Sequence, residues 1–257
     1  MLIDMNKKSG RAVRMLAVVA SLLSVVSLTQ AAEESGYEQP HNDVTNVASL
    51  QRGARNFVNY CSGCHSAKYV RYNRLAVALQ LSDEQMTQNL IFNGGKLTDT
   101  MTVAMNEVDA AKWFGKAPPD LSLIARARGT DYLYSFLKSF YLDASRPTGM
   151  NNTVLASAAM PNVLWELQGI QQPVYEGETT ADGNVEKHFT GFELVTEGKL
   201  SEEEFDEFVR DTVNFLDYIG EPVQVERRAL GYKVMLFLLV LFLLAAALKK
   251  EYWKDIK

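Results

Sequence analysis

Apolar residues recur at helical spacing in several stretches of the 257-residue chain. The stretches 50–60 (LQRGARNFVNY) and 131–142 (DYLYSFLKSFYL) each place apolar or aromatic side chains on one face of a helix. Capping-box patterns, in which a serine is followed three residues later by Gln or Glu, begin two more helices at Ser82 and Ser201. The second of these continues to Tyr218. The pattern therefore predicts a mainly α-helical domain.

One stretch breaks the helical pattern. Residues 173–195 (PVYEGETTADGNVEKHFTGFELV) contain few helix-forming residues, and Asp182-Gly183 is a hairpin turn signal. We expect a small β-hairpin or an extended insertion in the helical domain, with His188 as a surface residue on it. Further along, Pro222 ends the last helix of the domain, because proline disfavours helical geometry at the preceding residue.

The N-terminus has the three parts of an export signal. Four basic residues precede a run of fourteen apolar or small residues from Met15 to Leu28, and small residues follow at Ala31 and Ala32. The run is short against the roughly 20 residues that span a bilayer. A cleaved signal over residues 1–32 is therefore favoured over a retained membrane helix, with cleavage after either alanine.

The C-terminus carries a longer apolar run. Gly231 to Leu248 is eighteen residues with one charge, Lys233, near its edge. Aromatic residues flank the run, as they do at membrane interfaces. We predict a connection and transmembrane anchor over residues 227–248, followed by a lysine-rich cytoplasmic tail at 249–257. A buried core helix is the weaker interpretation, because the run has no polar face.

The exported part, residues 33–226, differs in charge from the whole chain. It holds 28 acidic and 15 basic residues, a formal charge of −13, whereas the whole chain carries −5. An acidic domain repels nucleic acid and attracts basic proteins, although acidity can also serve solubility alone. We expect one domain on the periplasmic side of a bacterial inner membrane, with no nucleic-acid partner.

The candidate chemistry follows the first predicted helix, in Cys61-Ser62-Gly63-Cys64-His65. Two cysteines three apart in a helical turn project from one face, and the next residue stays on that face. Each thiol can add its S–H across one haem vinyl group, which leaves the histidine under the iron. The pattern is the one that marks c-type haem attachment, with His65 as the proximal ligand.

Two other interpretations of this motif are weaker. A structural zinc site usually needs four Cys or His ligands, and besides this motif only His41 and His188 remain to complete one. A thioredoxin-like redox pair does not require a histidine after its second cysteine. The motif therefore favours one covalently bound haem c.

The second axial ligand decides the chemistry of the iron. A thioether raises the haem potential, and six-coordinate iron has no open position for a substrate. The candidates in the exported domain are His41, His188, Met86, Met101, Met105, Met150 and Met160. Met160 is modestly favoured, because small residues precede it and Pro161 follows it, which suits a loop close to a porphyrin. For any single methionine, core filling is the alternative.

Two arginines are candidates for the haem propionates. Arg126 and Arg128, followed by Tyr132, come shortly after the segment 118–122 (PPDLS). Guanidinium groups pair well with carboxylates, and an arginine beside a buried propionate would offset its desolvation. A pair of surface arginines explains the pattern equally well.

Taken together, these segments resemble the cytochrome c1 family in its bacterial form. The resemblance rests on four segments of the chain: residues 61–74, 117–128, 160–167 and 220–233, the last leading into the C-terminal anchor. The ordered set is far more specific than the haem motif alone, and it covers almost the whole mature chain.

The resemblance implies a cytochrome c-like haem domain with the haem-site residues Cys61, Cys64, His65, Met160, Arg128 and Tyr132. Of these, His65 and Met160 would bind the iron, and Arg128 and Tyr132 would lie near a propionate. Some family members brace the methionine loop with an extra disulfide. This chain has no spare cysteine, so we expect its loop to be held by packing alone.

The implied function is electron transfer within the ubiquinol–cytochrome c reductase (cytochrome bc1) complex. The chain would accept an electron from the Rieske iron–sulfur protein and pass it to a cytochrome c, while quinol chemistry would belong to cytochrome b in a dimeric complex. The chain would have no catalytic site of its own. A membrane-anchored monohaem cytochrome c that donates to a terminal oxidase fits the same motifs. A haem enzyme or gas sensor would instead need an open iron position.

Overall fold

The structure is a computed structural model that describes residues 36–179 and 185–255. The predicted export signal and the hairpin turn at Asp182-Gly183 lie outside the described residues. The chain divides into two compact units, residues 1–38 and 39–257, and the elements below all belong to the second.

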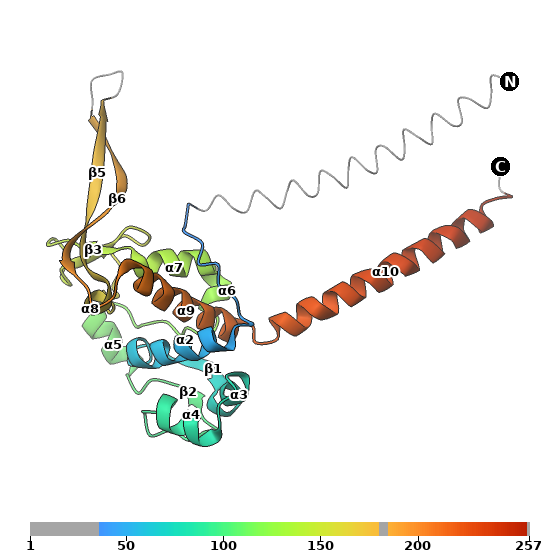
Figure 1. Ribbon diagram of the computed structural model, residues 1–257, viewed down its shortest axis with the longest axis horizontal. Coiled ribbons are helices and arrows are strands. Elements are labelled where there is room, and N and C mark those ends of the chain that lie inside the picture. Colours follow the sequence, from blue (N-terminus) through green and yellow to red (C-terminus); the bar gives the residue numbers. More distant parts are fainter. Residues whose placement is uncertain (1–35, 180–184, 256–257) are drawn as a thin grey trace. The chain divides into compact units, whose positions relative to one another are not determined.

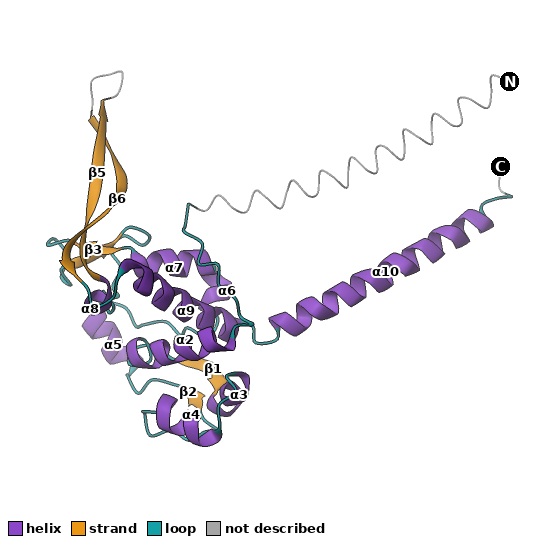
Figure 2. Ribbon diagram, viewed as in Figure 1, coloured by secondary structure: helices purple, strands orange, loops and turns teal. Residues whose placement is uncertain are grey.

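The second unit is about half helical with small antiparallel sheets, in agreement with the predicted mainly α class (Figures 1 and 2). Its helices are α2 (Val47–Tyr60), α3 (Tyr72–Ala78), α4 (Asp83–Leu90), α5 (Glu107–Phe114), α6 (Ile124–Arg128), α7 (Thr130–Lys138), α8 (Trp165–Gln168), α9 (Glu202–Gly220) and α10 (Gln224–Tyr252). Its strands are β1 (Ala67–Arg71), β2 (Thr100–Met101), β3 (Phe140–Leu142), β4 (Met150–Asn152), β5 (Gly169–Thr179) and β6 (Val185–Glu197). The strands pair as β1–β2, β3–β4 and β5–β6.

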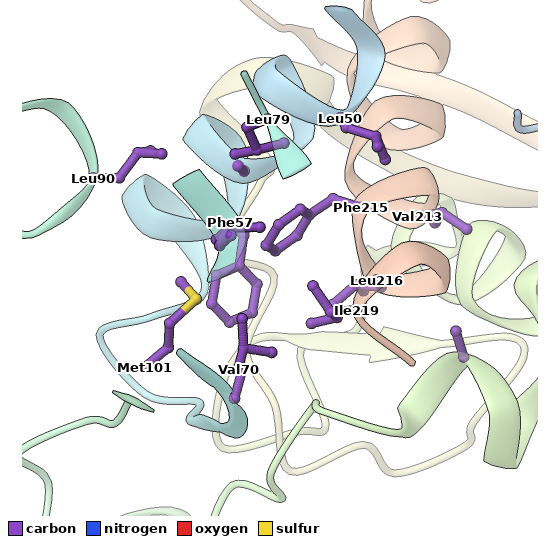
Figure 3. Packing of buried hydrophobic residues seen from close by; sticks show 14 of the residues in the cluster. Leu50, Phe57, Val70, Leu79, Leu90, Met101, Val213, Phe215, Leu216 and Ile219 are labelled. Atoms are coloured by element: carbon purple, nitrogen blue, oxygen red, sulfur yellow. The ribbon is translucent and has the colours of Figure 1, made fainter. Parts of the chain in front are cut away.

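Helices α2 and α9 lie side by side and form the centre of the core (Figure 3). Their apolar faces meet at Phe57 and Phe215, whose ring centroids are 5.5 Å apart and which are both fully buried. The two backbones approach closely at Gly53, where a Cβ atom would collide with the carbonyl oxygen of Asp211. The predicted first helix is thus confirmed, and its glycine is required by the partner helix.

A buried carboxylate joins the same two helices. Asp211 is 3% exposed, accepts a hydrogen bond from the hydroxyl of Ser49, and pairs with both Nε and Nη2 of Arg52. These partners offset the desolvation of the charge, which would otherwise be costly in the core. The N-terminal half of α2 is therefore fixed on α9 by charge as well as by packing.

The predicted helix starts and stops are largely confirmed. Both capping boxes form, with Ser82 and Ser201 as the N-caps of α4 and α9. Helix α9 ends at Gly220, two residues before Pro222, as the sequence indicates.

The helix predicted over residues 131–142 is wrong at its C-terminal end. Helix α7 stops at Lys138, and residues 140–142 form strand β3, which pairs with β4 in the register Phe140↔Asn152 and Leu142↔Met150. Aromatic residues favour a strand as readily as a helix, so the pairing partner decided the outcome.

The predicted hairpin is present and longer than expected. Strands β5 and β6 have 11 and 13 residues, and His188 is an exposed residue of β6 that pairs with Glu176. At the base of the hairpin the buried Gln171 donates hydrogen bonds from Nε2 to the carbonyl oxygens of Lys138 and Phe140, each 2.8 Å long. These bonds fix the insertion to the end of α7 and to β3.

Helix α10 contains the predicted transmembrane segment. With 29 residues it is about 43 Å long, and among the described residues it is the one helix long and apolar enough to cross a membrane. It begins at Gln224, so the connection expected from residue 227 is already helical. Its apolar side chains are exposed, which is consistent with a membrane anchor.

Candidate functional site

The haem motif forms the single turn that its spacing predicts. The chain continues past α2 with hydrogen bonds from the N–H of Cys64 and of His65 to the carbonyl oxygen of Cys61, 3.1 and 2.9 Å long. Both cysteines and the histidine are half-buried, and both thiols are free in the described part of the chain. The turn therefore presents two thiols and one imidazole together.

The imidazole of His65 is oriented by a backbone carbonyl. Its Nδ1 lies 2.7 Å from the carbonyl oxygen of Pro119, and because a carbonyl only accepts, Nδ1 carries the proton. The Nε2 lone pair is then available to bind a metal. Burial lowers the pKa of His65, partly opposed by this hydrogen bond and by the charge of Asp120, so the ring favours the neutral form that an iron ligand requires.

The segment containing Pro119 is itself held against the residues that follow the haem motif. The N–H of Leu121 donates to the carbonyl oxygen of Ser66 over 2.8 Å, and the N–H of Lys68 donates to Oδ2 of Asp120 over 2.9 Å. This support for the histidine was missed at the sequence level, where the segment suggested only nearby arginines. A backbone carbonyl acceptor can come from any residue type, so no side-chain pattern marks it.

The thiol of Cys61 lacks the lowered pKa that a redox pair requires. Burial, reinforced by the neighbouring Cys64, raises the pKa of Cys61 to about 12. Dithiol catalysts instead depend on a cysteine with a lowered pKa, which supplies the reactive thiolate. This environment counts against the thioredoxin-like interpretation.

The methionine candidates separate by burial. Met86 and Met101 are 0% and 3% exposed and belong to the hydrophobic core, which is the structural role considered for any single methionine. Met105 lines a surface hollow beside Cys64, and Met150 lies on β4. Met160 is half-buried and borders the same core cluster as Cys61 and Tyr132.

The expectation that packing alone holds the methionine loop is wrong. Two side chains at the end of β4 accept hydrogen bonds from the loop backbone, Asn151 from the N–H of Ser157 and Asn152 from the N–H of Val154 and Leu155. Neither asparagine was singled out in the sequence, although the bonds of Asn152 span only two and three residues and that of Asn151 spans six.

The two candidate arginines have different partners. The guanidinium carbon of Arg128 lies 5.5 Å from the ring centroid of Tyr132, so these two predicted residues come together. Arg126 instead forms an ion pair with Glu221 at the junction of α9 and α10, where Arg227 pairs with the same carboxylate. Hydrogen bonding from Arg227 is the main reason that the pKa of Glu221 is lowered, with further contributions from both positive charges. Arg126 is therefore held by Glu221, whereas Arg128 contacts Tyr132.

One buried donor near Met160 provides a further check on whether these residues fit a haem. The side chain of Asn162 is 6% exposed, its Oδ1 accepts from the N–H of Leu164, and its Nδ2 has no hydrogen-bond partner among the described residues. Buried donors are rarely left unpaired, so this one suits an acceptor that comes with a cofactor. Together with the oriented imidazole and the protonated thiol, it fits a c-type haem.

Comparison with known proteins identifies the family of the chain. A family model described as the Cytochrome C1 family matches residues 38–256. The chain belongs to the cytochrome c1 family. Membership implies a c-type haem and a role in electron transport.

Individual relatives cover most of the chain. It is similar to the cytochrome c1 of Allochromatium vinosum, with 49% identity over 91% of this chain and 96% of that protein. It is also similar to the ammonia monooxygenase gamma subunit of Nitrosomonas europaea, with 42% identity over 93% of this chain and 97% of that protein. A protein named cytochrome b/c1 from Bradyrhizobium diazoefficiens is 27% identical over 96% of this chain and 41% of its own length.

Proposed function

We propose that the chain carries one covalent haem c and serves as the electron-transfer subunit of a quinol:cytochrome c oxidoreductase. Cys61 and Cys64 would hold the haem, and His65 and Met160 would bind its iron. The observation that carries the proposal is the oriented imidazole. In a cytochrome c1 family member, His65 follows two free thiols in one turn and keeps Nε2 for a metal through its bond to Pro119.

Each residue of the site would have a distinct task. When bound, the haem supplies a one-electron couple. Met160 would occupy the sixth position and keep substrates away from the iron, which separates an electron carrier from a peroxidase or gas binder. Arg128, stacked on Tyr132, would balance the charge of a propionate.

The partners follow from the proposed place of the chain in the complex. We infer that the chain accepts an electron from the Rieske protein and donates it to a cytochrome c, beside a cytochrome b subunit in a dimeric assembly. The relative named cytochrome b/c1 supports the association with cytochrome b. Helix α10 would anchor the haem domain on the periplasmic side of the inner membrane.

The surface next to Cys64 suits a basic acceptor. The hollow beside this cysteine is lined by Glu107, Asp120 and Lys68, and Asp109 on α5 pairs with Lys112. The exported domain as a whole is acidic, with a formal charge of −13. If this surface steers the acceptor, the rate of electron transfer to a basic cytochrome c should fall as ionic strength rises. A rate independent of ionic strength would exclude steering by this surface.

Purification of the full-length chain from membranes tests the function. We expect haem to remain on the chain after denaturing electrophoresis, and we expect a dihaem cytochrome b and an iron–sulfur protein to co-purify. Met160→Ala should keep its covalent haem but change the haem spectrum, because the proposed sixth ligand is lost. Met101→Leu is the matched control, because Met101 is a core methionine and its replacement should leave the haem spectrum unchanged. Haem-free chain, or isolation without either partner, would contradict the proposal.

A second assignment shares the haem site and differs only in the partner. A membrane-anchored monohaem cytochrome c could donate to a terminal oxidase. The 42% identical relative is named as a subunit of a monooxygenase, so relatives of this chain are also named as subunits of a different complex. Co-purification with an oxidase, in place of cytochrome b and the iron–sulfur protein, would favour this second assignment.

A further inference from the structure

The loop that presents Met160 begins directly after strand β4. We propose that Asn151 and Asn152, which we call the asparagine frame, are positioning residues that hold this loop and so keep Met160 on the iron. The inference rests on the proposed role of Met160. It goes further by naming the groups that replace a covalent brace in a chain with no spare cysteine.

Asn152 fixes the start of the loop. Its side chain is 1% exposed, and its Oδ1 accepts from the N–H of Val154 (2.9 Å) and of Leu155 (3.0 Å). Its Nδ2 donates to the carbonyl oxygen of Phe136 over 2.8 Å. The amide oxygen faces backbone N–H groups and the amide nitrogen faces a carbonyl oxygen, so only one orientation of the amide satisfies all three bonds. The side chain thereby connects the loop to α7.

Asn151 fixes the middle of the same loop. Its Oδ1 accepts from the N–H of Ser157 over 2.8 Å, and its Nδ2 donates to Oδ2 of Asp143 over 2.9 Å. A carboxylate only accepts, so Asp143 determines that the amide oxygen faces Ser157. Ser157 has a positive φ of 62°, which is uncommon for a residue with a side chain and needs support from its surroundings.

The asparagine frame also connects the loop with the residues on the propionate side. Phe136, whose carbonyl oxygen binds Asn152, stacks its ring on Tyr132 at a centroid distance of 6.1 Å and an interplanar angle of 7°. Tyr132 in turn lies under Arg128. A backbone bond from the N–H of Thr153 to the carbonyl oxygen of Ser139 (3.2 Å) adds a second attachment to the end of α7.

These contacts favour the loop conformation that keeps Met160 on the iron over a conformation in which the loop is released. Met160 lies three residues beyond Ser157, so a loop released from the frame can carry the thioether away while the thiols and His65 keep the haem in place. Loss of one buried hydrogen-bond partner typically shifts such a balance by about tenfold. Asn152 contributes three such bonds. Its loss should therefore produce a measurable fraction of chain with an open iron position.

The test uses full-length protein in membranes with three variants: Met160→Ala, Asn152→Ala and the control Asn214→Ala. Asn214 is also 1% exposed and donates Nδ2 to Asp43 and Ser49, but it lies on α9. The readouts are the far-red charge-transfer band of methionine-bound ferric haem and carbon monoxide binding by the ferrous form. For Asn152→Ala we expect covalent haem to be retained, a weakened band, and a carbon monoxide-binding fraction raised about tenfold or more. Asn214→Ala should resemble wild type in both readouts.

An exchange of Asn151 and Asp143 provides a second test that does not depend on the folding of Asn152→Ala. Asn151→Asp keeps the acceptor for Ser157 but sets a second carboxylate against Asp143, so the band should weaken. Adding Asp143→Asn restores a donor–acceptor pair in the opposite sense and should recover the band. Recovery in the double variant supports the frame, and a band unaffected by Asn151→Asp overturns its Asn151 part.

The outcomes separate the inference from the proposed function. If Met160→Ala keeps the far-red band and still excludes carbon monoxide, Met160 is not the ligand. The proposal that Met160 closes the sixth position of the iron is then wrong. If Met160→Ala abolishes both while Asn152→Ala behaves like wild type and Asn214→Ala, the ligand stands and the asparagine frame is wrong.

Discussion

The two sides of the haem site are built in different ways. The side of His65 is one continuous turn at the end of α2, a helix whose contact with α9 is fixed by the close approach at Gly53 and by the buried Asp211. The side of Met160 is an irregular loop held by side-chain hydrogen bonds from β4. The first side depends on a helical turn, a packed helix and one distant carbonyl oxygen, and the second on two asparagine side chains that are themselves attached to Phe136 and Asp143.

This difference predicts how each side fails. On the proposed function, damage to the turn should remove the cofactor, because the two attachment thiols and the proximal ligand that we propose all lie within five residues. Damage to the loop should leave the cofactor attached and change only the sixth ligand. The site can therefore lose its closed coordination without losing its haem.

The largest effect is expected when both thiols are removed. Cys61→Ala with Cys64→Ala deletes both points of attachment, so haem should be absent from the chain after denaturing electrophoresis. Asn152→Ala, on the other side of the site, should keep its haem under the same conditions. Covalent haem in the double cysteine variant would contradict the assignment of the turn.

A smaller effect is expected from Gly53→Ala, which tests the packed helix behind the turn. The added Cβ would collide with the carbonyl oxygen of Asp211, so α2 and α9 must separate. Overpacking of this kind costs about 1–3 kcal/mol, measured as a lower free energy of unfolding in denaturant titrations. Gly191→Ala is the control, because a Cβ there meets no atom within 4 Å. Equal stability of the two variants would show that the helices are not in close contact.

The smallest effect is expected from acidification, and it should fall on the methionine side. Hydrogen bonds from Ser145 and Asn151 lower the pKa of Asp143, and Arg146 contributes further, while Tyr141 is the other titratable neighbour. A carboxyl with a lowered pKa stabilises the folded loop fully above its usual value of about 3.9 and loses that contribution as pH falls through the lowered value. The far-red band of wild type should therefore weaken at acid pH, and Asp143→Asn should remove this component of the titration. An identical acid titration in both proteins would contradict the link from Asp143 to the loop.

Much of the helical fold could be predicted from sequence because its signals are local. The capping boxes at Ser82 and Ser201, the end of α9 before Pro222, and the apolar run in α10 each depend on residues close together in the chain. The end of α7 could not be predicted, because Phe140 to Leu142 became a strand only through pairing with β4.

The candidate site shows the same division. The two cysteines and His65 form a local motif with a known chemistry. The support of that histidine by a carbonyl oxygen, and the attachment of Asn151 to Asp143 and of Asn152 to Phe136, join segments that only the folded chain brings together. Arg126 and Arg128 look equivalent in sequence, and only the position of Glu221 separates their roles.

The most direct test of the central claim is the haem midpoint potential of wild type and Met160→Ala in membranes, measured with the ferric spectrum. Thioether ligation raises the potential, and axial ligands tune haem potentials over a range of roughly 0.8 V. We predict that Met160→Ala keeps its covalent haem, loses the far-red band, and falls in potential by on the order of a few tenths of a volt. An unchanged potential and spectrum would contradict the claim that Met160 closes the iron to substrates.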